Sequence, residues 1–212
     1  MNNTLNRTVR SLQSFLKREV ADHVFFKVPD DRHADQSYQI QVASPQVNLF
    51  QSTAREVTRP GHTPMAAAPQ IVIQVLDIED KPIEQARDLT IQLTCILWNP
   101  GTHGNEFMIP EKEDSLTGRV FHPNDEPNVF SQSYNGWQDL YTLSDMILTA
   151  LQSQPGDLID QGVRVLVEDG ITAGPYRTES GPIDSHPYYL GWIRFSIRSS
   201  IIRNLFDPYS NL

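Results

Sequence analysis

The single cysteine, Cys95, is the first candidate for chemistry because a thiolate is a strong nucleophile. A catalytic cysteine needs a base such as histidine beside it, and no histidine lies near Cys95 in the sequence. Leu93 and Leu97 lie two positions away on either side, which is typical of the apolar face of a strand. We therefore predict a buried thiol that packs in the core. A lone cysteine also excludes an internal disulfide and fits a reducing compartment.

Histidines are the next candidates because imidazole binds zinc and transfers protons. His62, His103, His122 and His186 lie in loop-like stretches without the i, i+4 or Cys-x-x-Cys spacing of a preformed zinc site. We interpret them as surface residues, and a site assembled from loops stays open as the alternative. The glycine-rich nucleotide motifs and the Gly-x-Ser-x-Gly hydrolase motif are absent from the sequence. The sequence thus predicts no metal, no cofactor and no catalytic residue.

Asp77, Glu79 and Lys81 come nearest to a catalytic pattern. An acid followed by Glu-x-Lys is typical of metal-dependent nucleases, in which carboxylates hold a divalent cation and the lysine helps to position the attacking water. Such a motif should lie on a strand, whereas Asp80, Lys81 and Pro82 look like a turn. We therefore interpret the three side chains as the solvated face of a hairpin, with the nuclease as the alternative.

Composition narrows the class of protein. The chain has 212 residues, a formal net charge of -9 and a pI near 5.0, so a basic face that holds nucleic acid tightly is not expected. No apolar run approaches the roughly 20 residues that cross a bilayer, and the N-terminus lacks a signal-peptide core. We expect a soluble protein, made in a cytoplasm, with no membrane partner.

Residues 137–152 have the clearest helical pattern of the chain and must lie on an apolar surface. The stripe consists of Leu140, Leu143, Ile147 and Leu151, widened by Trp137, Tyr141 and Leu148. Asn135 is a candidate N-cap, and Pro155-Gly156 is a stop signal. Residues 3–20 predict a second amphipathic helix with Leu5, Val9, Leu12, Leu16 and Val20 on one stripe.

Strands are predicted where apolar residues alternate with polar ones. Short candidates are residues 25–28, 38–42 and 47–50, and stronger ones are residues 70–76, 89–97, 163–167 and 189–197. The runs at 70–76 and 89–97 look like neighbouring antiparallel strands joined by the turn at 80–82. The predicted fold is a single α+β domain over residues 1–212, with a mostly antiparallel sheet packed against the N-terminal and central helices.

Three stretches supply no core face. Residues 51–68 predict a long exposed loop, and residues 99–136 predict a loop excursion from the core. Residues 200–212 follow the last strand and predict a C-terminal arm, because they carry too many apolar groups for a tail left in water. The alternative is that this segment folds back onto its own domain.

Four stretches stand in a characteristic order along the chain. They are Ala68-Pro69-Gln70-Ile71-Val72-Ile73, Leu89-Thr90-Ile91-Gln92-Leu93, Gly136-Trp137-Gln138-Asp139-Leu140 and Pro187-Tyr188-Tyr189-Leu190-Gly191-Trp192. This order, after an N-terminal helix, resembles the tail terminator, or tail-completion, proteins of long-tailed bacteriophages and phage-tail-like particles. The resemblance spans most of residues 1–200. The chain is longer than the family pattern, chiefly in residues 99–136 and 169–187, which leaves open a specialised neck or tail component.

The resemblance implies a structural virion protein of the tail or neck, assembled in the host cytoplasm, and not an enzyme. Family members form a hexameric ring on the last ring of the tail tube, end tube polymerisation and join the tail to the head-completion proteins. The implied partners are further copies of the chain, the tail tube protein and a head-completion or neck protein, with a sheath protein as a further candidate. DNA would pass through such a ring without specific binding.

Apolar residues in the two irregular segments are the candidate subunit or partner interface, because nothing local would bury them. They are Phe107, Met108, Phe121 and Phe130 in the excursion, and Ile201, Ile202, Leu205, Phe206 and Tyr209 in the arm. Two functions from other classes remain as alternatives: a phage-encoded metal-dependent nuclease, and a small adaptor that caps another partner complex.

Overall fold

The computed structural model describes the two long helices, the central sheet and several short hairpins. The described residues are 4–29, 41–49, 56–57, 65–101, 108–114, 118–123, 136–154, 156, 158–160, 162–179, 181–182 and 185–200. No helix in these ranges is both long and apolar enough to span a membrane.

The centre of the molecule is a seven-stranded sheet with the strand order β10-β11-β15-β7-β6-β3, in which β12 also pairs with β15. Its strands are β3 (Gln46–Leu49), β6 (Gln70–Lys81), β7 (Ala86–Trp98), β10 (Leu158–Asp160), β11 (Val163–Val165), β12 (Thr172–Pro175) and β15 (Tyr188–Ser200). All pairings are antiparallel except that of β3 with β6, which is parallel. The predicted α+β class with a mostly antiparallel sheet is therefore confirmed.

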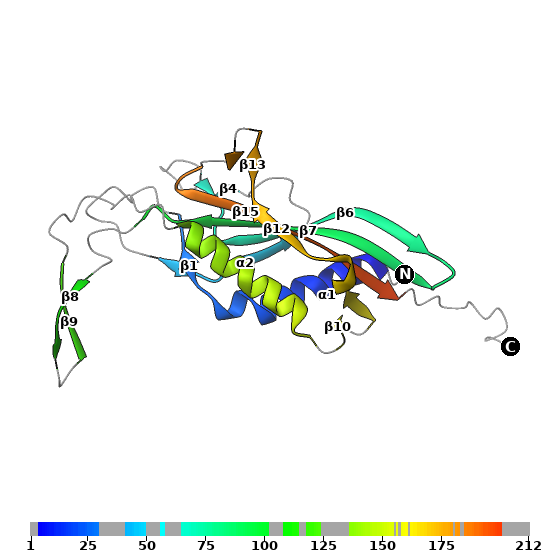
Figure 1. The fold of residues 1–212 in the computed structure, drawn as a ribbon, viewed down its shortest axis with the longest axis horizontal. Helices are drawn as coiled ribbons and strands as arrows, with labels where there is room; N and C mark the ends of the chain where they lie inside the picture. The colour runs from blue at the N-terminus through cyan, green and yellow to red at the C-terminus, as the bar shows by residue number, and fades with distance from the viewer. Residues whose placement is uncertain are drawn as a thin grey trace.

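Two helices, α1 (Thr4–Glu19) and α2 (Gly136–Gln152), lie on the same face of this sheet (Figure 1). The predicted stripes face the core. Leu12 and Leu16 of α1 and Leu143 and Ile147 of α2 are fully buried against the inward residues of β6, β7 and β15. Short 3-10 turns follow α1 at Ala21–His23 and β11 at Val167–Asp169. The apolar residues that recur at every second position of the strands and at every third or fourth position of the helices therefore form one apolar layer.

Smaller two-stranded sheets surround this core. They are β1 (Phe26–Lys27) with β2 (Val42–Ala43), β4 (Glu56–Val57) with β5 (Met65–Ala66), β8 (Met108–Asp114) with β9 (Gly118–Pro123), and β13 (Arg177–Thr178) with β14 (Gly181–Pro182). The stretches 51–68 and 99–136, predicted as loops, thus each contain a hairpin. Prolines and charged residues break the alternation there, which removes the strand signal from these stretches.

Two expectations about the long elements are wrong. Trp137 and Tyr141 were assigned to the buried stripe of α2, but they are 49% and 51% exposed. Their rings contact each other edge to face on the outer side of the helix, with centroids 5.6 Å apart. The turn expected at residues 80–82 also lies further on. Strand β6 continues to Lys81, and the turn spans residues 82–85.

The start of α2 is held by an unusually close contact between Gly136 and the ring of Tyr189 on β15. A Cβ added to Gly136 would lie 2.1 Å from Cε2 of Tyr189, so no larger residue fits without movement. Asn99, just after β7, donates a 2.6 Å hydrogen bond to Oδ2 of Asp139 in the first turn of the helix. Close packing and a side-chain bond together fix the helix on the sheet.

Candidate subunit interface

Strands β6 and β7 extend beyond the part of the sheet that β3 covers, and we call residues 76–88 the hairpin extension. Strand β3 pairs with β6 from Gln70 to Ile73 only, so no described strand borders β6 from Gln74 to Lys81. The unpaired side of a strand offers backbone donors and acceptors to a partner. On the other side, β7 pairs with β15 along its whole length, up to Ala86 opposite Ser200. The extension is therefore a continuation of the sheet with one edge that no described strand covers.

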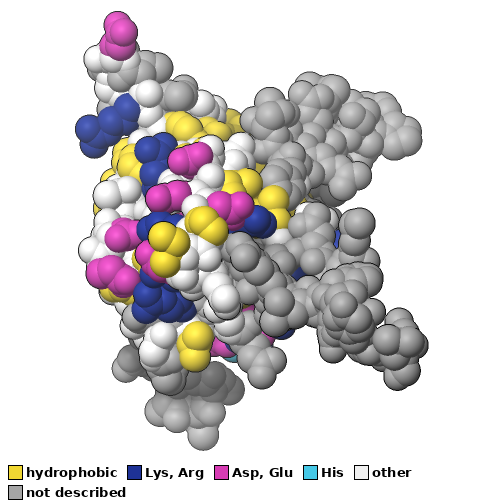
Figure 2. Space-filling view, turned by 90° about the vertical axis from the view of Figure 1, so that its right-hand side faces the viewer, with side chains coloured by type: hydrophobic (Ala, Val, Ile, Leu, Met, Phe, Trp, Pro, Cys, Tyr) yellow, Lys and Arg dark blue, Asp and Glu magenta, His cyan; other side chains and the backbone are white. Residues whose placement is uncertain are grey.

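Apolar side chains are exposed along this extension. Leu76 and Ile78 of β6 are 47% and 45% exposed, and Ile83 in the turn is 99% exposed. A β-bulge between Val75 and Asp77 places Leu76 outside the regular register. Figure 2, which views the end of the molecule where the hairpin extension ends, shows hydrophobic, acidic and basic side chains side by side. Exposed apolar groups among charges are typical of a binding surface.

An ion-pair network lies on the extension where three strands meet. Arg198 of β15 donates hydrogen bonds of 2.7 Å to both carboxylate oxygens of Asp88 on β7. Lys81 of β6 reaches the same carboxylate at 2.7 Å, and Arg198 also lies 3.1 Å from Oε2 of Glu84 in the turn. Nearby, Arg87 and Asp80 form a separate ion pair. The network holds β15, β7 and β6 together at the base of the turn.

The electrostatic effect of this network is largest at Asp88, whose side chain is nearly buried. The hydrogen bonds from Arg198, and then those from Lys81, lower the pKa of Asp88 to about 2 against the opposing effect of burial. The hydrogen bond to Asp88 in turn raises the pKa of Lys81. Asp88, Lys81 and Arg198 therefore stay charged at neutral pH, and their ion pairs have a structural role.

The candidate nuclease motif falls within this network. Asp77, Glu79 and Lys81 all lie on strand β6, so the objection that they occupy a turn is wrong. The register places Asp77 opposite Thr90 and Glu79 opposite Asp88. Lys81, however, is bound to Asp88 and lies 3.6 Å from Oε2 of Glu79. In the described part of the chain, no group of His, Cys, Asp and Glu side chains converges in a way that could hold a metal ion.

A polar stripe crosses the sheet face opposite the helices. Tyr176, which follows β12, shares a 2.8 Å hydrogen bond with Thr94 and accepts one of 3.1 Å from Gln92 on β7. Gln92 in turn accepts a 2.9 Å hydrogen bond from Arg194, whose guanidinium lies 5.6 Å from the Trp192 ring centroid. Strands β12, β15 and β7 thus share one hydrogen-bonded surface on this face.

Helix α1 has a basic outer face. Arg7, Arg10 and Lys17 recur at helical spacing, and all three are exposed. Arg18 belongs to the same face but is bonded to Glu19 at 2.6 Å. The inner face of the helix is the apolar stripe that packs on the sheet. The apolar stripe predicts this helix from the sequence, but its cations alone predict no binding site.

Most of the predicted interface residues lie outside the described residues. This holds for Phe107, Phe130, Ile201, Ile202, Leu205, Phe206 and Tyr209. Met108 and Phe121 are found on β8 and β9, where the register pairs Met108 with Pro123 and Pro110 with Phe121. The interface role of both segments therefore stays a prediction.

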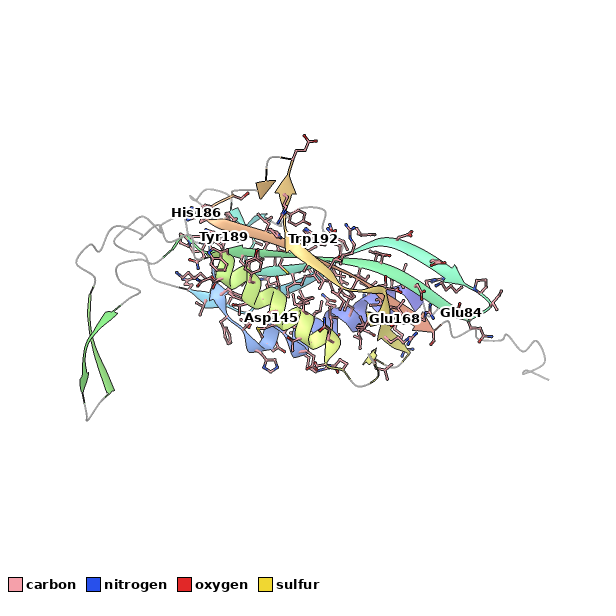
Figure 3. The ribbon with its side chains drawn as sticks, in the orientation of Figure 1. Glu84, Asp145, Glu168, His186, Tyr189 and Trp192 are labelled. Carbon is pink, nitrogen blue, oxygen red and sulfur yellow. The ribbon has the colours of Figure 1, made fainter. Side chains whose placement is uncertain are left out.

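The remaining residues that were candidates for chemistry are Cys95 and the histidines. Cys95 is fully buried in the core, as predicted, and burial raises the pKa of its thiol to about 12. His186 is exposed and contacts the ring of Tyr189 edge to face, at the end of the molecule opposite the Glu84 turn (Figure 3). His62 and His103 lie outside the described residues, and His122 is on β9.

The chain was compared with protein-family models, with curated proteins and with solved structures, and none of the three comparisons gave a match. The resemblance to tail terminator proteins therefore rests on the order of sequence stretches alone. Function is inferred from the surfaces of the chain itself, chiefly from the hairpin extension and the outer face of α1.

Proposed function

We propose that this chain is a structural subunit of a closed ring of the tail terminator type. In this proposal the ring caps a phage tail tube, ends tube polymerisation and contacts the head-completion proteins of the neck. One observation carries the proposal: the hairpin extension has a strand edge that no described strand covers, together with exposed Leu76, Ile78 and Ile83. A subunit that presents such a surface gains stability when another subunit covers it.

The size of that gain supports association. Fully burying a Leu or Ile side chain contributes roughly 1.5 to 3 kcal/mol. Leu76 and Ile78 are already about half covered, so we expect each to gain about half of that, whereas Ile83 is 99% exposed and would gain nearly all of it. The cost of association is of similar size, which favours a ring that closes cooperatively over isolated pairs.

The polar stripe supports the further expectation that DNA passes without being held. Its amides and hydroxyls bond to one another, and Arg194 is engaged by Gln92 and Trp192. Tight binding of a phosphate backbone requires several free cations in a row. In the proposed ring this sheet face lines the channel, where it offers DNA little attraction in a chain of net charge -9.

The test replaces the apolar groups of the hairpin extension by charge. We expect Ile78→Lys combined with Ile83→Lys to weaken self-association at least tenfold, because both side chains would have to be buried in the contact. Val42→Lys is the matched control, since Val42 is 57% exposed on β2, away from the extension. Light scattering over a concentration series measures the mass of each variant. An unchanged oligomer in the double variant would contradict the role of the extension.

A further inference from the structure

The outer face of α1 and the hairpin extension carry opposite charge. Helix α1 holds the four bases Arg7, Arg10, Lys17 and Arg18 and the single acid Glu19, a net charge of +3. Residues 77–84 hold the four acids Asp77, Glu79, Asp80 and Glu84 and the single base Lys81, a net charge of -3. Arg87 and Asp88 complete the hairpin extension without changing this net charge, and Arg198 of β15, which pairs with Glu84 and Asp88, reduces it to -2. The two surfaces therefore have net charges of opposite sign.

The dimensions of the two surfaces also match. From Arg7 to Lys17 the helix rises about 15 Å at 1.5 Å per residue. From Asp77 to Lys81, where β6 ends, the strand covers about 13 Å at roughly 3.3 Å per residue. The long Arg and Lys stems on α1 supply apolar methylene groups, which can cover Ile78 and Ile83 while their charged ends reach the carboxylates.

One copy of the chain cannot bring these surfaces together. The hairpin extension continues the sheet and is fixed by the pairing of β7 with β15 up to Ser200. It projects past the N-terminal end of α1 (Figure 1). The basic side chains of α1 are exposed, whereas the apolar stripe of the helix packs on the sheet. A contact between these two surfaces must therefore join two molecules.

We propose that the hairpin extension of one copy docks on the basic outer face of α1 in the next copy. This proposal rests on the proposed ring function and names the two halves of its subunit contact. Because the two surfaces are different patches of the same chain, the contact is heterologous and repeats head to tail until the ring closes. Complementary charges fix the relative position of the two copies, and the exposed apolar groups of the hairpin are buried in the contact.

Charge reversal tests the contact. The first variant, Arg10→Glu with Lys17→Glu, makes the helix face acidic. The second, Asp77→Lys with Glu79→Lys, makes the hairpin basic. We expect each variant alone to associate about tenfold to a hundredfold more weakly than the wild type at low salt. The control, Asp145→Lys with Asp169→Lys, changes the net charge on exposed residues outside both surfaces and should associate at least as well as the wild type.

Mixing the two reversed variants gives the decisive result. In an equimolar mixture the two variants can alternate around the ring, so that every acidic surface contacts a basic one. Assembly should then return in rings with an even number of subunits. All of these effects should weaken as salt is raised from 0.05 to about 0.5 M, because salt screens exposed charges. Analytical ultracentrifugation measures the association, and circular dichroism checks that each variant is folded.

The possible outcomes distinguish a failure of this contact from a failure of the proposed ring. If the wild type forms rings and both reversed variants form them equally well, the contact is wrong and the proposed function stands. If the wild type stays monomeric throughout, both proposals fail. If the helix variant assembles normally but loses binding to a short DNA duplex at low salt, the basic face serves nucleic acid and the contact is overturned.

Discussion

Arg198 and Asp88 are 110 residues apart in sequence, yet they face each other across β15 and β7 through two hydrogen bonds of 2.7 Å. Such a two-pronged pair between a guanidinium and a carboxylate combines charge with fixed geometry. Lys81 adds a third contact from β6. The pair thus joins the three strands from which the hairpin extension emerges.

This pair makes stability depend on pH. The folded pKa of Asp88 is about 2, below the unfolded value near 3.9, so its contribution is fully present above about pH 4 and is lost as pH falls through 2. We expect that contribution to be on the order of 2 kcal/mol. Asp88→Asn should lower the free energy of unfolding at pH 6 and flatten its fall between pH 4 and 2.

Urea unfolding at pH 6, 4 and 2.5 measures this effect, with Asp77→Asn as the matched control on the exposed part of the same hairpin. The control should follow the wild-type pH dependence closely. A wild-type slope that persists unchanged in Asp88→Asn would show that other carboxylates cause the acid sensitivity.

A second prediction concerns the packing of α2 on β15. Gly136→Ala would place a Cβ 2.1 Å from Cε2 of Tyr189, so the ring or the helix must shift. We expect a loss of roughly 1 to 3 kcal/mol of stability, as for other overpacked cores. In Gly174→Ala, the added Cβ would have its nearest neighbour at 3.7 Å, and that variant should lose less than 1 kcal/mol. Equal losses in both variants would refute the steric explanation.

The nuclease alternative makes an opposite prediction about Asp77, Glu79 and Lys81. Because Lys81 is bound to Asp88, we expect the wild type to leave supercoiled plasmid uncut in Mg²⁺ or Mn²⁺. The triple alanine variant should behave identically in this gel assay. Metal-dependent cleavage by the wild type that disappears in the triple variant would establish the enzyme and reject the structural role.

The C-terminal segment gives a fourth prediction. Strand β15 ends at Ser200, whose backbone N–H donates a 2.9 Å hydrogen bond to the carbonyl oxygen of Gly162. Deleting residues 201–212 leaves this last bond in place, so we expect thermal unfolding of the monomer to shift by no more than about 2 °C. Assembly should weaken, because Ile202 and Phe206 would no longer reach a neighbour. A large loss of monomer stability would instead place the segment in the subunit's own core.

Local patterns were sufficient to predict the main layers of the fold. The stripe of Leu140, Leu143 and Ile147 placed α2 on the sheet, and the alternation around Cys95 placed its thiol in the core. The same reasoning was wrong for Trp137 and Tyr141, because helical periodicity fixes a direction but not the width of the buried stripe. Only the arrangement of the strands underneath decides how far around the helix the contact reaches.

The candidate interface was harder to predict, because it depends on register between distant strands. The bulge between Val75 and Asp77 decides that Glu79 lies opposite Asp88, and no sequence signal marks that bulge. The pairing of Asp88 with Arg198 likewise needs β15 to lie beside β7. The basic residues of α1 can be read in the sequence, but no local pattern matches them to an acidic hairpin.

The mass of the assembled wild-type protein tests the central claim most directly. Native mass spectrometry at increasing protein concentration, with negative-stain electron microscopy of the same samples, would give both the subunit number and the shape. A subunit of 24.1 kDa that forms one closed ring should show a single dominant oligomer, six subunits in the family pattern, with a central hole. Monomers at every concentration, or open chains of unlimited length, would contradict the account.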